Sequence, residues 1–401
     1  MATSLAIILL LGLIVNELFT KFKLPGLLGM ILLGIVIGPS GFSLLNKDLL
    51  TISSDIRKVA LIVILLRAGL GTSKNDLKKI GKTAAKLSCI PGLIEGFTIA
   101  AIATLILDFS FVQGGMLGFI LAAVSPAVVV PFMLEFKNKR LGTNKSIPTL
   151  ILAASSIDDV FAITIFTTFL GFYGGKKVNI GMKILNIPLS IILGVVIGIV
   201  VGLLLIKIFK KYSLRDTKKI IILMSAAIFL TTLEDVLKDK IAIASLLGVM
   251  TIGFILLEKY PKVSYRLSVK LNKVWVIAQI FLFVLVGAEV KVGVIFDSGL
   301  LGVLIIAAGL IARSLGVVIS TLGTDLTLKE RIFCVVSYTP KATVQAAIGG
   351  IPLALGVKGG DLMLAIAVLS ILVTAPLGAL AIKILGNKFL HKENIEEVVS
   401  A

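Results

Sequence analysis

Two adjacent aspartates lie in Ile151-Leu-Ala-Ala-Ser155-Ser156-Ile157-Asp158-Asp159-Val160, in the middle of the apolar run 149–172. The run is long enough to cross a bilayer as a helix. A rise of about 1.5 Å per residue puts both carboxylates near the membrane midplane. One aspartate there costs at least about 2.5–3.5 kcal/mol on insertion scales. A single aspartate can be an interior hydrogen-bonding residue, but two in succession are hard to explain by packing. The pair therefore predicts an intramembrane cation or proton site.

The composition indicates an all-α polytopic membrane protein. Of the 401 residues, 57% are hydrophobic and only 15% are charged, which does not suit a water-soluble chain of this length. The net charge of +18 does not predict a nucleic-acid partner, because Lys and Arg lie in short loops without an aromatic-interleaved stripe. Cys89 and Cys334 fall in predicted spans and the one histidine, His391, in the tail, so neither a disulfide framework nor a histidine-rich metal site is predicted. No cofactor is expected.

About thirteen apolar runs, each a predicted transmembrane helix, are separated by polar loops. They are centred on 4–19, 26–44, 57–71, 86–107, 112–134, 149–172, 184–206, 219–234, 241–258, 274–289, 299–322, 331–352 and 361–386. Lys and Arg are concentrated in alternate loops, such as 74–86 and 259–273. The positive-inside rule puts those loops and a short tail at 388–401 in the cytoplasm, and the N-terminus outside. The basic loops are topology signals that can also attract anionic lipid.

An internal repeat relates the two halves of the chain. Leu27-Leu28-Gly29-Met-Ile-Leu-Leu-Gly34 in the second run matches Leu246-Leu247-Gly248-Val-Met-Thr-Ile-Gly253 in the ninth, and 65–70 in the third weakly resembles 285–290 in the tenth. The offset of seven helices is odd, so the second copy is inverted in the membrane. We therefore expect two inverted six-helix repeats joined by a linker helix at 184–206.

Two runs carry proline and hydroxyl side chains in mid-membrane. The fifth contains Ser125-Pro126-Ala-Val-Val-Val130-Pro131, and the twelfth contains Thr339-Pro340. Proline removes a backbone donor and clashes with the preceding turn, so each helix is expected to be unwound or kinked there. At matching positions of inverted repeats, this pattern predicts crossed discontinuous helices whose freed carbonyls coordinate a cation.

Further charges lie inside or near predicted spans. Glu95 is in the fourth run and Arg313 in the eleventh, again seven apart. An unpaired charge at that depth is costly, so we expect an ion pair that braces the two repeats. Lys341 lies at the depth of the paired aspartates, either as their counter-ion or as a second brace. Glu289 is expected at the rim of the membrane.

The residues themselves suggest competition between two ions for one site. A deep carboxylate can hold either a proton or a small hard cation, and oxygen ligands suit Na⁺ or Li⁺. Loading on one side and unloading on the other then exchanges the two ions without ATP. The candidate oxygen ligands are Asp158, Asp159, Ser155, Ser156 and the carbonyls around Val128 and Val129.

Two other classes of function compete with an antiporter. Paired carboxylates can line a cation channel, but the sequence has no repeated filter loop of the potassium-channel type. An intramembrane aspartyl protease needs its aspartates on two facing helices, whereas adjacent residues point about 100° apart on one helix. Asp361, the other candidate partner, lies at a loop edge and is too shallow. An enzyme is therefore not expected.

These motifs together resemble the signatures of cation:proton antiporters, most closely the NHA-type sodium/proton antiporters. The residues that carry the resemblance are Ser125–Pro131, Ser155–Asp159, Pro340–Ala346, Leu24–Gly26, Gly38–Pro39 and Leu66–Leu70. The resemblance implies a homodimer with a dimerisation panel of helices 1, 2, 8 and 9 (1–44 and 219–258). Helices 3–6 and 10–13 (57–172 and 274–387) would form a core that moves by an elevator-like mechanism.

The resemblance also implies roles for individual residues. Asp159 would be the principal cation and proton ligand, with Asp158 beside it, and Arg313 and Glu95 match a pair found in this branch. Na⁺ and Li⁺ are favoured over K⁺, and the cell membrane of a prokaryote is the expected location. Asp158 favours electrogenic exchange only if Lys341 contacts it and releases a proton when Na⁺ binds, because the guanidinium of Arg313 does not deprotonate. Without that contact, exchange should be electroneutral.

Overall fold

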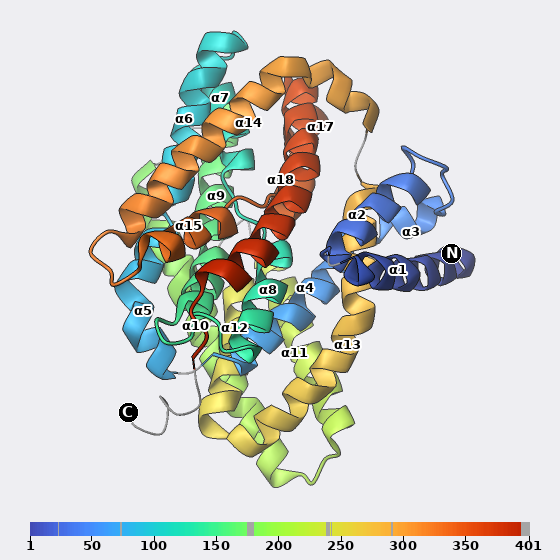
Figure 1. The fold of residues 1–401 in the computed structure, drawn as a ribbon, viewed down its shortest axis with the longest axis vertical. Helices are drawn as coiled ribbons and strands as arrows, with labels where there is room; N and C mark the ends of the chain where they lie inside the picture. The colour runs from blue at the N-terminus through green and yellow to red at the C-terminus, as the bar shows by residue number, and fades with distance from the viewer. Residues whose placement is uncertain are drawn as a thin grey trace.

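The computed structural model of the protein describes residues 1–22, 24–72, 74–174, 180–237, 241, 243–289 and 292–393. Over these residues the chain folds into α-helices (Figure 1), and one isolated β-bridge joins Leu141 to Lys392. The helices are α1 (Ala2–Lys21), α2 (Gly26–Ile37), α3 (Lys47–Thr51), α4 (Ser53–Leu70), α5 (Lys74–Leu87), α6 (Ile90–Ile106), α7 (Phe111–Leu121), α8 (Pro126–Asn138), α9 (Ile147–Tyr173), α10 (Ile180–Lys211), α11 (Asp216–Leu237), α12 (Ser245–Lys259), α13 (Pro261–Ala288), α14 (Val292–Thr321), α15 (Leu328–Ser337), α16 (Thr343–Ile348), α17 (Ile351–Ala354) and α18 (Gly360–Phe389).

The helix lengths fit a multi-pass membrane protein. In the part of the chain that the structure describes, nine helical stretches are long and apolar enough to cross a membrane. Two of them, Ile80–Ile106 and Phe111–Asn138, join consecutive helices across a break, and Gly26–Ile37 and Val344–Ala354 are shorter apolar helices. The all-helical, multi-pass class predicted from the sequence is confirmed. Residues 394–401 of the expected tail lie outside the described residues.

Two segments that the sequence suggested as loops are helical. Residues 74–86 form most of α5, because lysines four residues apart occupy one face while Ile80, Ala84 and Leu87 are buried on the other. Residues 261–273 form the first half of α13, which begins with Pro261 at its first position. The polar half of α13 therefore extends the apolar run 274–289 into one long helix.

Several other helix starts follow from local sequence. Proline opens α8 at Pro126 and lies in the first turn of α6 and α9, where its missing N–H group loses no intrahelical hydrogen bond. Ser110 and Gln113 form a reciprocal capping box at the start of α7, and Thr327 and Glu330 do the same at α15. These caps fix where the two interrupted helices begin.

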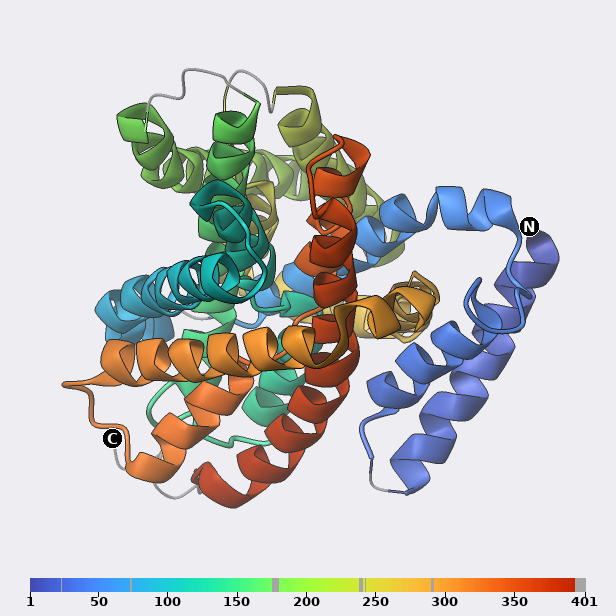
Figure 2. The ribbon, with the colours of Figure 1, turned by 90° about the horizontal axis from the view of Figure 1, so that it is seen from above.

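Glycines let two pairs of helices cross in close contact. A Cβ atom added to Gly34 of α2 would lie 2.0 Å from the carbonyl oxygen of Val284 in α13, and one added to Gly69 of α4 would lie 2.0 Å from that of Met250 in α12. Figures 1 and 2 show α1 and α2 along one edge of the molecule, beside α13. Each crossing therefore joins a helix of the first half to a helix of the second.

The other half of the fold surrounds the two broken helices. Helices α6, α7, α9, α14 and α18 pack against one another, while α8 and the α15–α16 break lie among them. Phe119 of α7 stacks on Phe169 of α9 and meets Phe97 of α6 edge to face. Arg57 of α4 forms a partly buried ion pair with Glu289, the residue that follows α13. This pair joins the end of α13 to α4.

Candidate functional site

Asp158 and Asp159 lie near the middle of α9 and are buried, with 1% and 7% of their surface exposed. Ser155 and Ser156, one turn earlier, are also buried. Both serine hydroxyls donate to the carbonyl of Leu152, at 3.3 and 2.9 Å. The Ser156 hydroxyl also lies 3.8 Å from Sδ of Met250 in α12. Because both hydroxyls act as donors in these contacts, the lone pairs of both serine oxygens remain as acceptors.

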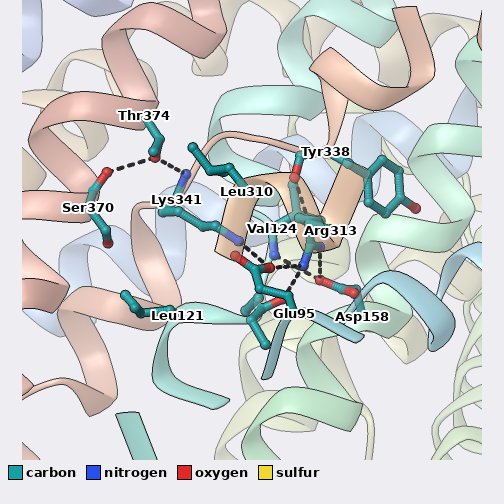
Figure 3. Close-up of polar contacts among 12 residues, drawn as sticks. Glu95, Leu121, Val124, Asp158, Leu310, Arg313, Tyr338, Lys341, Ser370 and Thr374 are labelled. Carbon is teal, nitrogen blue, oxygen red and sulfur yellow. Dashed lines mark hydrogen bonds and ion pairs between the residues drawn. The ribbon is translucent and has the colours of Figure 1, made fainter. Parts of the chain in front are cut away.

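Asp158 is held on one side of its carboxylate. Its Oδ2 accepts hydrogen bonds from the backbone N–H of Val124 at 2.8 Å and from Nη2 of Arg313 at 2.8 Å (Figure 3). Its Oδ1 is buried and has no hydrogen-bond partner among the described residues. Gly92 of α6 faces this oxygen, and a Cβ atom added there would lie 3.2 Å from it.

Arg313 of α14 joins both broken helices and two carboxylates. Its Nε donates to the carbonyl of Tyr338 at 2.6 Å, and Nη1 donates to Glu95 Oε2 at 2.6 Å and to the carbonyl of Ala122. The guanidinium also lies 5.4 Å from the ring centre of Tyr338. Arg313 was expected to pair with Glu95, but it is shared with Asp158 and is not committed to Glu95 alone.

Lys341 pairs with Glu95. Its Nζ donates to Glu95 Oε2 at 2.7 Å, and its backbone N–H donates to Oγ1 of Thr374 at 2.8 Å. Within the described residues, Lys341 has no ion pair with Asp158. Figure 3 shows the resulting chain of alternating charges, Lys341–Glu95–Arg313–Asp158, in which two cations balance two carboxylates.

Asp159 stands outside that balanced chain. Its Oδ1 is buried and has no hydrogen-bond partner in the described part of the chain, and the described ion pairs do not include Asp159. A buried carboxylate without a cation or donor is costly in its charged form. Among the described residues of this cluster, Asp159 is therefore the carboxylate whose charge no ion pair balances.

The two helix breaks are fastened to each other. The chain is non-helical at 122–125 and 338–342, and the N–H of Ser125 donates to the carbonyl of Pro340 at 2.8 Å. The side-chain amide of Gln345 donates to the carbonyls of Ile120 and Ala123 at 3.1 and 2.9 Å. Carbonyls freed by the breaks are thus satisfied by protein groups.

The remaining predicted residues lie around these breaks. Pro126 is the first residue of α8, Pro131 lies inside it, and Thr339 donates to the carbonyl of Val336 at 2.9 Å. Val128 and Val129 are in the first turn of α8, where their N–H groups donate to the carbonyl of Ser125. Among the described contacts, none brings these two valines to an aspartate.

Sequence reasoning missed several contributors to the site. They are the side chains of Gln345 and Thr374, the space at Gly92, and backbone groups of Ala122, Val124 and Tyr338. Gln345 could have been found, because an amide side chain three residues after a mid-membrane Lys-Ala break must find partners in the protein. The N–H of Val124 and the space at Gly92 carry no side-chain signal.

The family model and the similar relatives found for this chain agree on one family. Residues 5–388 match the family model for "Sodium/hydrogen exchanger, transmembrane". The human sodium/hydrogen exchanger 9B1 is 35% identical over 391 residues, covering 92% of this chain and 73% of the relative. The human exchanger 9B2 is 35% identical over 398 residues, covering 96% and 72%. The sodium proton antiporter MjNhaP1 from Methanocaldococcus jannaschii superposes with a TM-score of 0.77 at 22% identity, covering 96% of this chain and 97% of that one, which shows a shared fold.

Proposed function

The chain belongs to the family of transmembrane sodium/hydrogen exchangers, and from this we propose that it exchanges Na⁺ or Li⁺ for protons at Asp159, beside Asp158. The observation that carries the proposal is the state of Asp159, a buried carboxylate outside the balanced charge chain and with an oxygen that lacks a partner among the described residues. Either a proton or a cation removes its charge penalty. The chain is a transporter and not an enzyme, so the intramembrane-protease alternative does not hold.

A bound cation would use oxygen atoms that the protein leaves available. Oδ1 of Asp158 and Oδ1 of Asp159 both lack partners among the described residues. In the described hydrogen bonds the hydroxyls of Ser155 and Ser156 act as donors, which leaves the lone pairs of their oxygens for a cation. A carbonyl of Val128 or Val129 would complete the shell after a local shift of α8. Such an all-oxygen set suits a small hard cation.

The charge chain favours electroneutral exchange. Arg313 holds Asp158 through a guanidinium that does not deprotonate. Lys341, the other basic group of the cluster, contacts Glu95. With neither cation placed to release a proton as Na⁺ binds Asp159, one proton would leave for each Na⁺ that enters. This differs from the electrogenic coupling that a Lys341–Asp158 contact would have favoured.

We assign alternating access to an elevator-like movement of α5–α9 and α14–α18. The glycine crossings fasten α4 to α12 and α2 to α13, so this proposal places α4 and α13 in the static part. It thus departs from the sequence-based division, which counted 57–71 and 274–289 in the moving core. The static part would also contain α1, α2, α11 and α12, and these four helices would form the panel of a homodimer.

The proposed topology follows the repeat and the charge distribution. Two inverted six-helix repeats, joined by α10, would give thirteen crossings with the N-terminus outside and the C-terminus in the cytoplasm of a prokaryotic cell. The reciprocal crossings support the repeat, because Gly34 and Gly253, which match in sequence, each pack against the other half of the chain.

The test is ion-dependent proton flux in proteoliposomes with Na⁺, Li⁺ and K⁺ compared. Asp159→Asn, which keeps the shape but cannot titrate, should abolish exchange while the protein elutes and melts as a folded species. Asp361→Asn, at an exposed site in the first turn of α18, is the matched control and should retain wild-type flux. Substantial Na⁺-driven proton flux in Asp159→Asn would refute the site.

A further inference from the structure

A surface cavity away from Asp158 and Asp159 has four lysines among its lining residues. A cavity of about 650 Å³ opens between α5, the loop before α9 and the α14–α15 loop, a volume typical of small-ligand sites. Lys78, Lys82, Lys86 and Lys145 line it. Among the described residues of its wall, Asp325 alone is acidic.

The three lysines of α5 are available to a ligand. Lys78, Lys82 and Lys86 are exposed and follow one another at four-residue intervals, so their side chains share one face of the helix. None of them forms an ion pair with a carboxylate whose side chain the structure describes. Lys145 differs, because its Nζ lies 2.8 Å from Glu330 and 2.7 Å from the carbonyl oxygen of Asp325. These contacts join the loop before α9 to the α14–α15 loop and the start of α15.

The wall formed by the α14–α15 loop has few oxygens left for a cation. The carbonyl of Thr321 accepts from the hydroxyl of Thr324, and that of Thr324 accepts from Nη2 of Arg331. The carbonyl of Asp325 accepts from Lys145. Lys145 is balanced by Glu330, so among the described lining residues three ammonium groups face one carboxylate, Asp325. This excess of positive charge repels Na⁺ and attracts anions. The cavity is therefore separate in chemistry from the proposed cation path at Asp159.

We propose that this cavity binds a phosphate-bearing anion. A phosphate group offers several charged acceptor oxygens. The ammonium groups of Lys78, Lys82 and Lys86, which form no ion pair with a described carboxylate, lie on successive turns and can reach it together. The phosphate can come from the headgroup of an acidic phospholipid or from a soluble polyphosphate. Leu322, which is 52% exposed at the end of α14 and lines the cavity, adds an apolar surface next to the charged one. The binding does not depend on the proposed exchange reaction.

The experiment measures binding to the purified full chain in an uncharged detergent. Thermal melting is followed with increasing dioctanoyl phosphatidylglycerol, inorganic pyrophosphate, or dioctanoyl phosphatidylcholine, because a ligand that binds the folded state raises the midpoint. Phosphatidylglycerol, pyrophosphate or both should stabilise the protein, and phosphatidylcholine should not. Stabilisation by the first alone identifies a lipid headgroup, and by the second alone a soluble anion. No stabilisation by either would overturn the proposal.

Matched variants distinguish binding in this cavity from a general effect of the protein's positive charge. The triple variant Lys78→Gln/Lys82→Gln/Lys86→Gln should bind about a hundredfold more weakly, the product of the roughly fivefold that each lysine near an anionic surface contributes. The control is Lys207→Gln/Lys218→Gln/Lys262→Gln, which removes the same charge from exposed lysines outside the cavity. Equal weakening in the two triples would overturn the site.

Single changes keep the test decisive if a triple variant folds poorly. Lys82→Arg should retain binding because the positive charge remains, whereas Lys82→Glu should weaken it further than a neutral substitution. Equal binding by these two variants would contradict the proposal.

Discussion

Glu95→Gln removes a carboxylate that pairs with two buried cations, Arg313 and Lys341. Glu95 Oε2 lies 2.6 Å from Arg313 Nη1 and 2.7 Å from Lys341 Nζ, and all three side chains are at most 2% exposed. Glutamine keeps the shape but leaves the cluster with two cations for one paired carboxylate. Breaking a buried pair by removing one partner costs about 3–5 kcal/mol. With a typical unfolding entropy per residue, that lowers the melting midpoint of a 401-residue chain by about 4–6 °C.

A second substitution shows which cation depends on Glu95. Adding Lys341→Gln removes the stranded ammonium and leaves the Arg313–Asp158 pair intact, so it should recover part of the loss. Adding Arg313→Gln should recover less, because it also removes the partner of Asp158. Melting of purified protein in detergent measures both doubles, with Glu17→Gln at an exposed site as control. An unchanged midpoint for Glu95→Gln would show that Glu95 does not stabilise the two cations. Better recovery with Arg313→Gln than with Lys341→Gln would show that Lys341 is not the cation that depends on Glu95.

Three further outcomes are expected. Gly69→Ala should destabilise the protein by about 1–3 kcal/mol, because the added methyl group would lie 2.0 Å from a carbonyl oxygen of α12. Gly81→Ala is the control, because its methyl group would meet nothing within 4 Å. Equal melting midpoints for the two variants would contradict the tight crossing. Arg57→Gln should lower the midpoint less than Glu95→Gln, because its carboxylate partner is 31% exposed, and the same melting assay decides between them. Na⁺/H⁺ exchange in proteoliposomes should keep the same rate and end-point under a valinomycin-clamped K⁺ potential, and a response to that potential would show that Lys341 or another group releases an extra proton.

That the buried charges meet could be predicted from the sequence, but which of them pair could not, because the rotation of each helix about its axis could not be predicted. Counting residues along the apolar runs placed Glu95, Arg313 and Lys341 at comparable depth to the aspartates, which suffices to predict that opposite charges meet. Which cation faces which carboxylate depends on side-chain direction and on the neighbouring helices. That is why the sharing of Arg313 with Asp158, and the contact of Lys341 with Glu95, appear only in the structure.

The broken helices illustrate the same limit. Proline at Pro126 and Pro340 was sufficient to predict the breaks, because the missing donor is a local property. The partners of the freed carbonyls are not local, since Gln345 reaches residues more than 200 positions earlier. In α5, by contrast, the lysine spacing was visible in the sequence, but counting charges alone suggested a loop where the periodicity indicates a helix.

The first helix break takes its hydrogen-bond donors from residues that the ribosome makes much later. The carbonyls of Ile120, Ala122 and Ala123 are satisfied by Arg313 and Gln345, which follow them in the chain by about 190 to 225 residues. At a synthesis rate of roughly 5–20 residues per second, the ribosome makes those partners some 10 to 45 s later. Until then, the newly inserted first half holds polar backbone and the carboxylates of α6 and α9 without their cations. Water, lipid headgroups or the insertion machinery must shield these groups during synthesis. The first half should therefore be unstable in the membrane when it is made alone, and it should become stable when the second half is co-expressed.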